Sequence, residues 1–284
     1  MPLNTACVGR DYPPVTINVT LDSLQKYARA YNDDNPAFFD AHRAGGIVAP
    51  PMFGVTVTWD ALMKAMMDPD LHVDLLRLVH GEQDMEFPNP IHPGDVITAT
   101  AKIISIDLKT TGETMTVELN AANQKGQLVQ KTHFIIFIRG ARNRDAASSD
   151  PRPVEPDRGA QLFSVAQTID QDQTFRYAEA SGDPNPIHVD ENIAKMAGLP
   201  GIIVHGLCTM AFTSKVAIDR LCAGDPNRLK RLRVRFSRPV LPGQTITTKV
   251  WADGEHGGRK VFAYETFNPD GHAVIKGGIA EVAS

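Results

Sequence analysis

Long apolar runs, an excess of positive charge and paired cysteines are all missing from this sequence. No window approaches the roughly 18 uninterrupted apolar residues that a membrane-spanning helix needs, and the first 20 residues lack the charged and apolar regions of a secretion signal. The 29 Lys and Arg residues are fewer than the 33 Asp and Glu residues, and no basic and aromatic cluster could follow a phosphate backbone. We therefore expect neither a membrane span nor a nucleic-acid partner.

Cysteine is scarce, because the 284 residues include only Cys7, Cys208 and Cys222, in none of the spacings that bind zinc. Three cysteines cannot all pair, and unpaired thiols are typical of a reducing compartment. Together with the missing secretion signal, this predicts a cytoplasmic protein. Hydrophobic residues, at 42%, are plentiful enough for one large domain or for two domains of about 140 residues.

The sequence contains the same unit twice. Tyr27–Pro36 (YARAYNDDNP) is matched by Tyr177–Pro186 (YAEASGDPNP) at an offset of 150 residues, and Pro90–Asp95 is matched by Pro239–Gln244 at an offset of 149. The similar offsets predict few insertions between the copies. Gly, Ser and Pro residues interrupt the pattern between them. We predict a first domain over residues 1–145, a linker over 146–160 and a second domain over 161–284.

Each copy combines one helical pattern with several strand patterns. Apolar residues recur at helical spacing from Val55 to Met66 and from Leu207 to Leu221. Alternating or fully apolar segments, typical of strands, cover 96–106, 115–121, 134–138, 232–236, 246–252 and 261–267. The sequence predicts an α+β fold in which an antiparallel sheet wraps a long helix in each copy, with the two sheets joined edge to edge.

Polar groups suited to catalysis are concentrated in the second copy, within Tyr177–His188. Pro184 and Pro186 fix their own φ angles and favour extended backbone at the residues before them. Asp183 and His188 can therefore be aimed at a common point with little flexibility. A carboxylate and an imidazole that meet at one water are the groups that general acid–base catalysis needs.

Two other interpretations of this segment stay open from the residues alone. The Gly-Asp-Pro-Asn-Pro run is also typical of a plain turn, with His188 packed in the core. Alternatively, Asp183, His188, Asp190 and His205 supply carboxylate and imidazole ligands that several divalent metals accept, although they show no recognised ligand spacing.

The segment resembles the hydratase 2 motif of the MaoC-like dehydratases, the R-specific enoyl-CoA hydratases of the hot-dog fold. The matching residues are Tyr177, Ser181, Gly182, Asp183, Asn185, Pro186, Ile187 and His188, continued by Gly201–Leu207. In the first copy, His80–Phe87 and Pro93–Asp95 look like the amino-terminal domains of double hot-dog members. The resemblance covers nearly the whole chain and implies a double hot-dog fold.

This resemblance implies a hydro-lyase that adds water reversibly to a trans-2-enoyl-CoA and gives the (3R)-hydroxyacyl-CoA, without metal or cofactor. It assigns the water to Asp183 and His188, the orientation of that pair to Asn185, and a hydrogen bond to the thioester carbonyl to the backbone N–H of Gly206. Gly206 also opens the second helical pattern, where N–H groups and the helix dipole stabilise developing negative charge. A tight strand-to-helix turn is the plainer interpretation of His205–Gly206.

The first copy departs from the motif at two decisive places. Phe38 stands where the second copy has His188, and Pro50–Pro51 stands where it has His205–Gly206. Without the imidazole there is no second proton carrier, and Pro51 has no N–H to donate. We therefore expect a non-catalytic first domain that supports the tunnel for the acyl chain.

The expected partner is an acyl-CoA thioester, and the resemblance also allows a homodimer of two double hot-dog chains. The densest basic cluster, either an entrance for the coenzyme phosphates or a charged strand face, is Lys230, Arg231, Arg233, Arg235 and Arg238. Three other activities stay open. They are dehydration of a 3-hydroxyacyl group on acyl carrier protein, hydrolysis by a hot-dog thioesterase, and acyl-CoA binding without catalysis.

Overall fold

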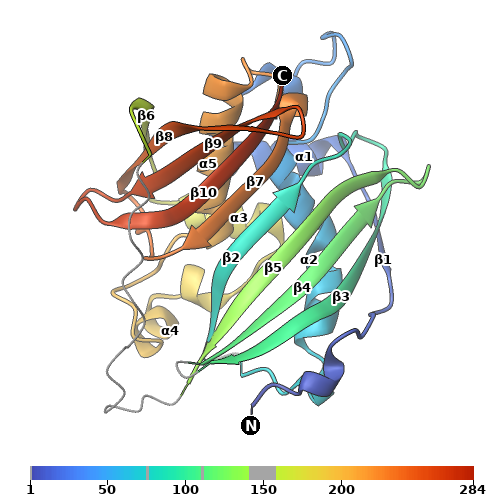
Figure 1. The fold of residues 1–284 in the computed structure, drawn as a ribbon, viewed down its shortest axis with the longest axis vertical. Helices are drawn as coiled ribbons and strands as arrows, with labels where there is room; N and C mark the ends of the chain where they lie inside the picture. Colours follow the sequence, from blue (N-terminus) through green and yellow to red (C-terminus); the bar gives the residue numbers. More distant parts are fainter. Residues whose placement is uncertain (1, 75–76, 110–111, 141–157) are drawn as a thin grey trace.

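The structure, a computed structural model, describes residues 2–74, 77–109, 112–140 and 158–284. Its main feature is one antiparallel sheet of ten strands, in the order β1-β3-β4-β5-β2-β7-β10-β9-β8-β6 (Figure 1). Strands of the first half occupy one side of this sheet and strands of the second half occupy the other. The predicted α+β fold with two sheets joined at their edges is confirmed.

The first half wraps its strands around the long helix α2. Its strands are β1 (Val15–Asn18), β2 (Leu78–Glu86), β3 (Val96–Lys109), β4 (Gly112–Ala122) and β5 (Leu128–Arg139), and its helices are α1 (Leu21–Arg29) and α2 (Gly54–Met66). Helix α2 buries Leu62 and Met66 in a cluster with Ile103 and Val117 of β3 and β4. The helical spacing that begins at Val55 is confirmed.

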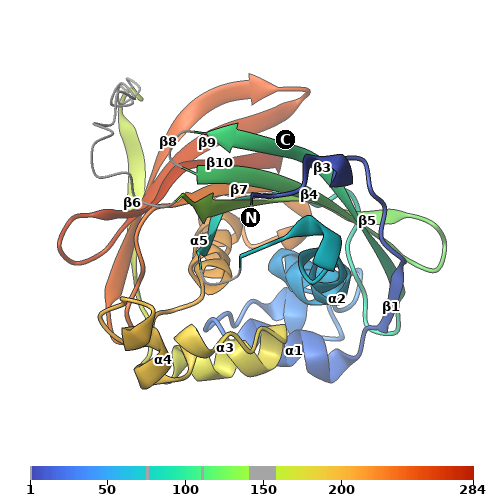
Figure 2. The same cartoon turned by 90° about the horizontal axis from the view of Figure 1, so that it is seen from below.

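The second half repeats this arrangement around α5. Its strands are β6 (Gln161–Thr168), β7 (Leu229–Phe236), β8 (Thr245–His256), β9 (Arg259–Phe267) and β10 (Ala273–Ala283), and its helices are α3 (Gln173–Ser181), α4 (Glu191–Met196) and α5 (Gly206–Leu221). All these helices lie on one side of the continuous sheet (Figure 2). No helix in the described part of the chain is long and apolar enough to cross a membrane.

Strands β2 and β7 form the seam between the two halves, and their outer faces carry opposite charges. Arg231 makes two hydrogen bonds to the carboxylate of Asp84, at 2.6 and 2.8 Å, and Arg233 lies 2.9 Å from Glu82. Leu232 lies between these arginines on the opposite, buried face. Part of the basic cluster therefore pairs the halves across the seam and does not line a substrate entrance.

Helices α1 and α3 lie side by side and mark a twofold relation between the halves (Figure 2). The hydroxyl oxygens of Tyr27 and Tyr177, counterparts at the offset of 150, are 2.8 Å apart and fully buried. Phe53 and Phe212, one from each half, belong to the same continuous apolar core. The two copies therefore fold around one shared core.

The similar offsets along the sequence hide two compensating insertions. Val204 donates its backbone N–H to the carbonyl of Val240, and Ala49 donates to that of Ile91, each at 2.8 Å. Ala49 therefore corresponds to Val204 at an offset of 155, and Ile91 corresponds to Val240 at an offset of 149. The extra residues of the second half include α4, just before the His205–Gly206 turn.

The predicted linker falls between β5, which ends at Arg139, and β6, which begins at Gln161. Most of the segment 146–160 lies outside the described residues. The division at this point stays a prediction, although each flanking strand belongs to the half that the repeat assigns to it.

Candidate active site

Asp183 lies in a stiff turn directly after helix α3. Gly182 ends this helix in the left-handed region, at φ 78°, which costs a glycine little. One carboxylate oxygen of Asp183 accepts the backbone N–H of Asn185 at 3.1 Å. The side chain of Asn185 accepts the N–H of Ile187 and begins the short 3-10 helix Pro186–His188. Asn185 therefore holds Asp183 through its backbone and not through its side chain.

His188 has one ring nitrogen available towards Asp183. Its Nδ1 lies 2.8 Å from the carbonyl oxygen of Ile203, which can only accept, so Nδ1 carries the proton and Nε2 keeps a lone pair. Potential ligand atoms of Asp183 and His188 lie within 4.8 Å of each other. A single water can contact both groups at this separation, since each hydrogen bond spans about 2.8 Å. The structure thus brings together the carboxylate and the imidazole that the sequence singled out.

His205 supports the His188 ring, a role that the sequence did not indicate. The two rings are stacked, with centroids 3.7 Å apart and planes inclined by 26°. Thr174 of α3 connects them, because its hydroxyl donates to the carbonyl of His188 at 2.9 Å and lies 3.2 Å from Nδ1 of His205. Both histidines are buried. His188 is therefore held on one side by a ring and at Nδ1 by a carbonyl.

Burial moves the pKa values of the acid–base pair towards each other. Burial raises the pKa of Asp183 above its usual value, against the opposing effects of the Asn185 N–H and of His188. Burial lowers the pKa of His188, and burial together with His188 lowers the pKa of His205 to about 2. His205 is thus neutral, and proton exchange between Asp183 and His188 becomes less costly than between the same groups in water.

Gly206 begins the long helix α5 beside this pair. A Cβ atom at this position would lie 3.2 Å from the nearest ring carbon of Phe236, a tighter contact than side chains normally make. The preceding residue, His205, bonds Thr174 instead of capping the helix. The first turn therefore keeps the positive end of the helix dipole without a side-chain cap. Glycine at 206 allows Phe236 to approach this turn closely.

Asp183, His188 and His205 also form a group that could hold a metal ion. Because the two rings are stacked 3.7 Å apart and inclined by only 26°, their nitrogen lone pairs lie in two nearly parallel planes, which disfavours convergence on one ion. A tetrahedral site needs convergent ligands. Asp190, the fourth candidate, uses its carboxylate to cap α4. The geometry therefore favours a water between Asp183 and His188 over a metal.

Larger side chains fill the corresponding region of the first half. Tyr31 occupies the position of Ser181, and Phe38 occupies that of His188. Both aromatic side chains are fully buried in the shared core. Aromatic side chains therefore fill the first half at the positions where the second half has Ser181 and His188.

The carboxylate that remains in the first half is paired with a lysine. Asp33, the counterpart of Asp183, lies 3.4 Å from Nζ of Lys215, which reaches across from α5. Asp34 and Asp219 also lie within 3.3 Å of this ammonium group. Burial raises the pKa of Asp33, and Lys215 opposes that increase. Asp33 thus has an ion-pair partner where Asp183 has an imidazole.

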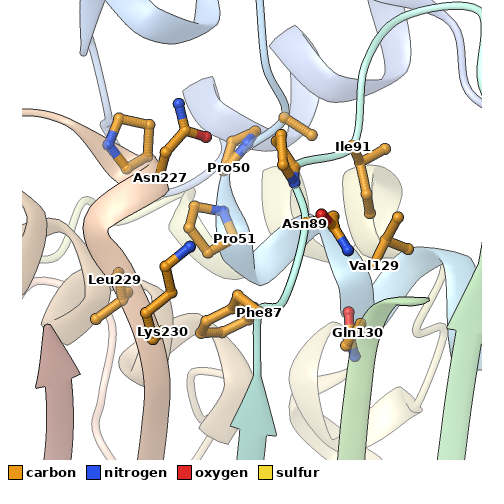
Figure 3. Close-up of a pocket in the computed structure, with 13 residues that line it drawn as sticks. Pro50, Pro51, Phe87, Asn89, Ile91, Val129, Gln130, Asn227, Leu229 and Lys230 are labelled. Carbon is orange, nitrogen blue, oxygen red and sulfur yellow. The ribbon is translucent and has the colours of Figure 1, made fainter. Parts of the chain in front are cut away.

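A small pocket lies where the first half carries Pro50 and Pro51 (Figure 3). Phe87 and Lys230 line it together with these prolines, and the side chains gather around its mouth. Pro51, at the position of Gly206, has no N–H to donate. The pocket therefore lacks the backbone donor that a thioester carbonyl would need at this position.

The fold is a double hot-dog whose second half brings Asp183 and His188 together, and a different family model matches each half of the chain. The model of the MaoC like domain matches residues 155–270, and the model of the FAS1-like dehydratase domain region matches residues 6–132. The first of these matches contains Asp183, His188 and Gly206.

Similar proteins cover most of the chain. A probable enoyl-CoA hydratase 2 of Dictyostelium discoideum is 30% identical over 246 residues, which are 85% of this chain and 80% of that protein. A peroxisomal multifunctional enzyme type 2 of Drosophila melanogaster is 30% identical over 228 residues, which are 78% of this chain but 37% of that protein. The crystal structure of a MaoC-like dehydratase from Phytophthora capsici superposes with a TM-score of 0.82 at 25% identity, covering 99% of this chain and 98% of that one. The chain belongs to this family of MaoC-like dehydratases and type 2 enoyl-CoA hydratases.

Proposed function

We propose that this protein is a hydro-lyase that adds water reversibly to trans-2-enoyl-CoA and forms the (3R)-hydroxyacyl-CoA. The observation that carries the proposal is the placement of Asp183 and His188 within 4.8 Å of each other, directly beside the first turn of α5. The family membership supports the same reaction class.

The proposed reaction uses one water and no covalent intermediate. The water oxygen adds to C3 of the enoyl group, one water proton passes to the Asp183–His188 pair, and a proton from the pair is delivered to C2. Negative charge develops on the thioester oxygen during this addition, where the N–H of Gly206 stabilises it. Burial brings the pKa values of the two proton carriers closer together, which lowers the cost of the transfer.

Replacing either member of the pair tests this mechanism. Asp183→Asn and His188→Ala should each lower kcat by about 100- to 10,000-fold, because one proton carrier is lost. The double variant should be much less impaired than the product of the single losses, since both groups act on the same water. The rate is measured from the ultraviolet band of the enoyl thioester.

The first half provides a matched control for these variants. Asp33→Asn removes the counterpart carboxylate, and its kcat should stay within about threefold of the wild type if this half is non-catalytic. Activity within threefold of wild type for Asp183→Asn and His188→Ala would exclude the pair from the mechanism.

Chelation separates the water mechanism from a metal mechanism. Prolonged treatment with EDTA should leave the hydration rate unchanged, because the proposed water is activated by Asp183 and His188 alone. Addition of zinc after chelation should also have no effect. Inactivation by EDTA that zinc or iron reverses would favour a metal at Asp183, His188 and His205.

Two related activities use the same residues or the same fold. Dehydration of a 3-hydroxyacyl group on acyl carrier protein differs only in the carrier, and comparison of the two carriers with one acyl chain distinguishes them. Thioester hydrolysis would release free thiol from acyl-CoA, which a thiol reagent detects. The Asp183–His188 pair favours hydration over hydrolysis, since it is suited to adding water at a double bond.

The remaining parts of the proposal concern the whole chain. The first half supports the path of the acyl chain without taking part in the chemistry. Two chains associate as a homodimer, which the mass in solution tests. The protein acts in the cytoplasm, a proposal that the three free cysteines support because unpaired thiols are typical of a reducing compartment.

A further inference from the structure

A β-bulge in β2 brings a histidine of the first half towards the proposed site. The register between β2 and β5 shifts between His80 and Glu82, so Gly81 is the extra residue. His80 consequently pairs with Ile136 and lies on the inner face of the sheet, as Gln83 does. Without the bulge, strict alternation would place residues three apart on opposite faces. The bulge therefore redirects His80 inward.

On the inner face, His80 is fixed by two rings and one amide. Its ring is stacked on Phe134, with centroids 3.9 Å apart, and inclined against Phe236 at 4.8 Å. Its Nε2 lies 3.1 Å from Oε1 of Gln83, a side chain that is only 2% exposed. Phe236 in turn lies so close to Gly206 that a Cβ atom added there would be 3.2 Å from its ring. A series of close contacts thus connects His80 of the first half with the first turn of α5.

The internal repeat shows that this polar pair occurs in only one of the two equivalent positions. Strand β7 has the same bulge, with Lys230 as the extra residue opposite β10. At the offset of 149, Leu229 is the counterpart of His80 and Leu232 is the counterpart of Gln83. Both leucines are buried. The proposed site of the second half therefore has a histidine–glutamine pair nearby, whereas the pocket beside Pro51 is lined by Leu229.

Apolar packing would suffice if this position served only the core. The counterpart leucines show that the fold accepts an apolar pair here, and burying polar groups costs free energy unless they are well paired. His80 and Gln83 lie beside the proposed site, and their counterparts in the repeat are apolar. This difference indicates that the polar pair has a role in the site.

We propose that His80 is a positioning residue: held by Gln83, it fixes Phe236 against the first turn of α5 and thereby fixes the Gly206 N–H at the thioester carbonyl. This inference rests on the proposed function, in which Gly206 binds that carbonyl. It makes the site composite, because a residue of the first half completes the catalytic site of the second.

Three variants separate positioning from stability. His80→Ala removes the ring and should lower kcat by about 10- to 100-fold, the size expected when a catalytic group is displaced by a fraction of an ångström. His80→Phe keeps a flat ring against Phe236 but loses the hydrogen bond to Gln83, so it should restore kcat only in part, to a value between those of His80→Ala and the wild type. Leu229→Ala, with Leu229→Val as a milder form, is the matched control, which should lower the Tm with little change in kcat.

The hydrogen bond to the thioester carbonyl can be measured directly, and a change in stability alone would not alter it. A cinnamoyl-type enoyl thioester absorbs at longer wavelength when its carbonyl accepts a hydrogen bond. In an Asp183→Asn background, which should bind this probe without turnover, His80→Ala should reduce the wavelength shift and Leu229→Ala should preserve it. The Tm of each variant is measured alongside.

The possible failures are distinguishable. Equal effects of His80→Ala and Leu229→Ala on kcat and on the wavelength shift would overturn the positioning role and leave His80 as core packing. Loss of kcat in His80→Phe as large as in His80→Ala would also overturn it, because the ring would then not be what matters. Absence of hydration activity in the wild type would refute the proposed function itself, while the wavelength shift would still report on His80.

Discussion

Three histidines of this chain lie against other rings, and burial lowers the pKa of each. The pKa falls to about 4 at His80 and to about 2 at His205, and that of His188 is also lowered. Their hydrogen bonds give them different roles. His80 contacts Gln83 and His205 contacts Thr174, whereas His188 uses Nδ1 for a carbonyl and keeps Nε2 for the region near Asp183. The hydrogen bonds therefore suit His80 and His205 to the proposed role of support, and His188 to the proposed role of proton carrier.

Stability and catalysis should respond in opposite directions at Asp183. Its pKa is raised by burial, so the folded chain penalises the ionised carboxylate at every pH above the usual aspartate value of 3.8. Asp183→Asn removes this penalty and should raise the Tm at pH 7 while it lowers kcat. The difference in Tm should disappear as the pH falls towards 3.8, where the carboxyl group is protonated in both states.

Thermal unfolding at a series of pH values measures this effect. Asp253→Asn, at an exposed position on β8, is the control, and it should show no comparable gain at pH 7. A lower Tm for Asp183→Asn at neutral pH would mean that the hydrogen bond from Asn185 outweighs the cost of burial.

At the scale of single residues, the sequence pointed to the acid–base pair but not to its supports. Asp183 and His188 were identifiable because two prolines stiffen the short segment between them. His205 lies 17 residues after His188, and its stacking on His188 depends on the path that the chain takes between them. The spacing of the two residues in the sequence does not reveal this path. Asn185 acts through its backbone N–H, a group that every residue other than proline has.

Among the elements, α5 serves both halves of the molecule. Its first residue, Gly206, lies at the proposed site, and Lys215, in its second half, reaches Asp33 of the first half. The Lys215 side chain is 20% exposed and the Asp33 side chain 1% exposed, so this ion pair is largely shielded from water. The pair thus fixes α5 at a second point, away from the end that lies at the proposed site.

Breaking this pair should destabilise the fold without removing activity. Lys215→Met leaves Asp33 buried without its cation and should lower the free energy of unfolding by about 3 kcal/mol at neutral pH. The loss should shrink on acidification, because protonation of Asp33 removes the unpaired charge. The double variant Lys215→Met, Asp33→Asn should recover most of the loss, as urea unfolding at two pH values would measure. Equal losses in the single and double variants would contradict the ion-pair explanation.

The elements that the sequence missed are those whose pattern is short or interrupted. Strand β2 carries polar residues on both faces, with Gln83 inward and Glu82 and Asp84 outward, and its bulge at Gly81 breaks the alternation. The nine-residue helices α1 and α3 are too short for their apolar spacing to stand out. Strand β10 was also missed, and its register is broken between Lys276 and Ile279. By contrast, α2, α5 and the strands β3, β4, β5, β7, β8 and β9 follow their patterns for long enough to be predicted.

For the whole molecule, the filled region of the first half is expected to influence which acyl chains are accepted. If this half supports the acyl path, Phe38→Ala should change kcat/KM for long enoyl chains more than for the shortest, because a short chain would not reach the altered wall. Ile97→Val, a truncation elsewhere in the first half's core, is the control. Equal losses for all chain lengths would identify Phe38 as core packing, at a cost of about 3 to 5 kcal/mol.

The contact between the Tyr27 and Tyr177 hydroxyls has an evolutionary consequence. A residue can meet its own counterpart only on a twofold axis, as at the centre of a symmetric dimer. The pair at 2.8 Å is the contact expected if such a dimer became one chain by duplication and fusion of its gene. Such a fusion would free each copy to change alone, so that one could lose its histidine and glycine while the axis, which both copies share, kept its tyrosines.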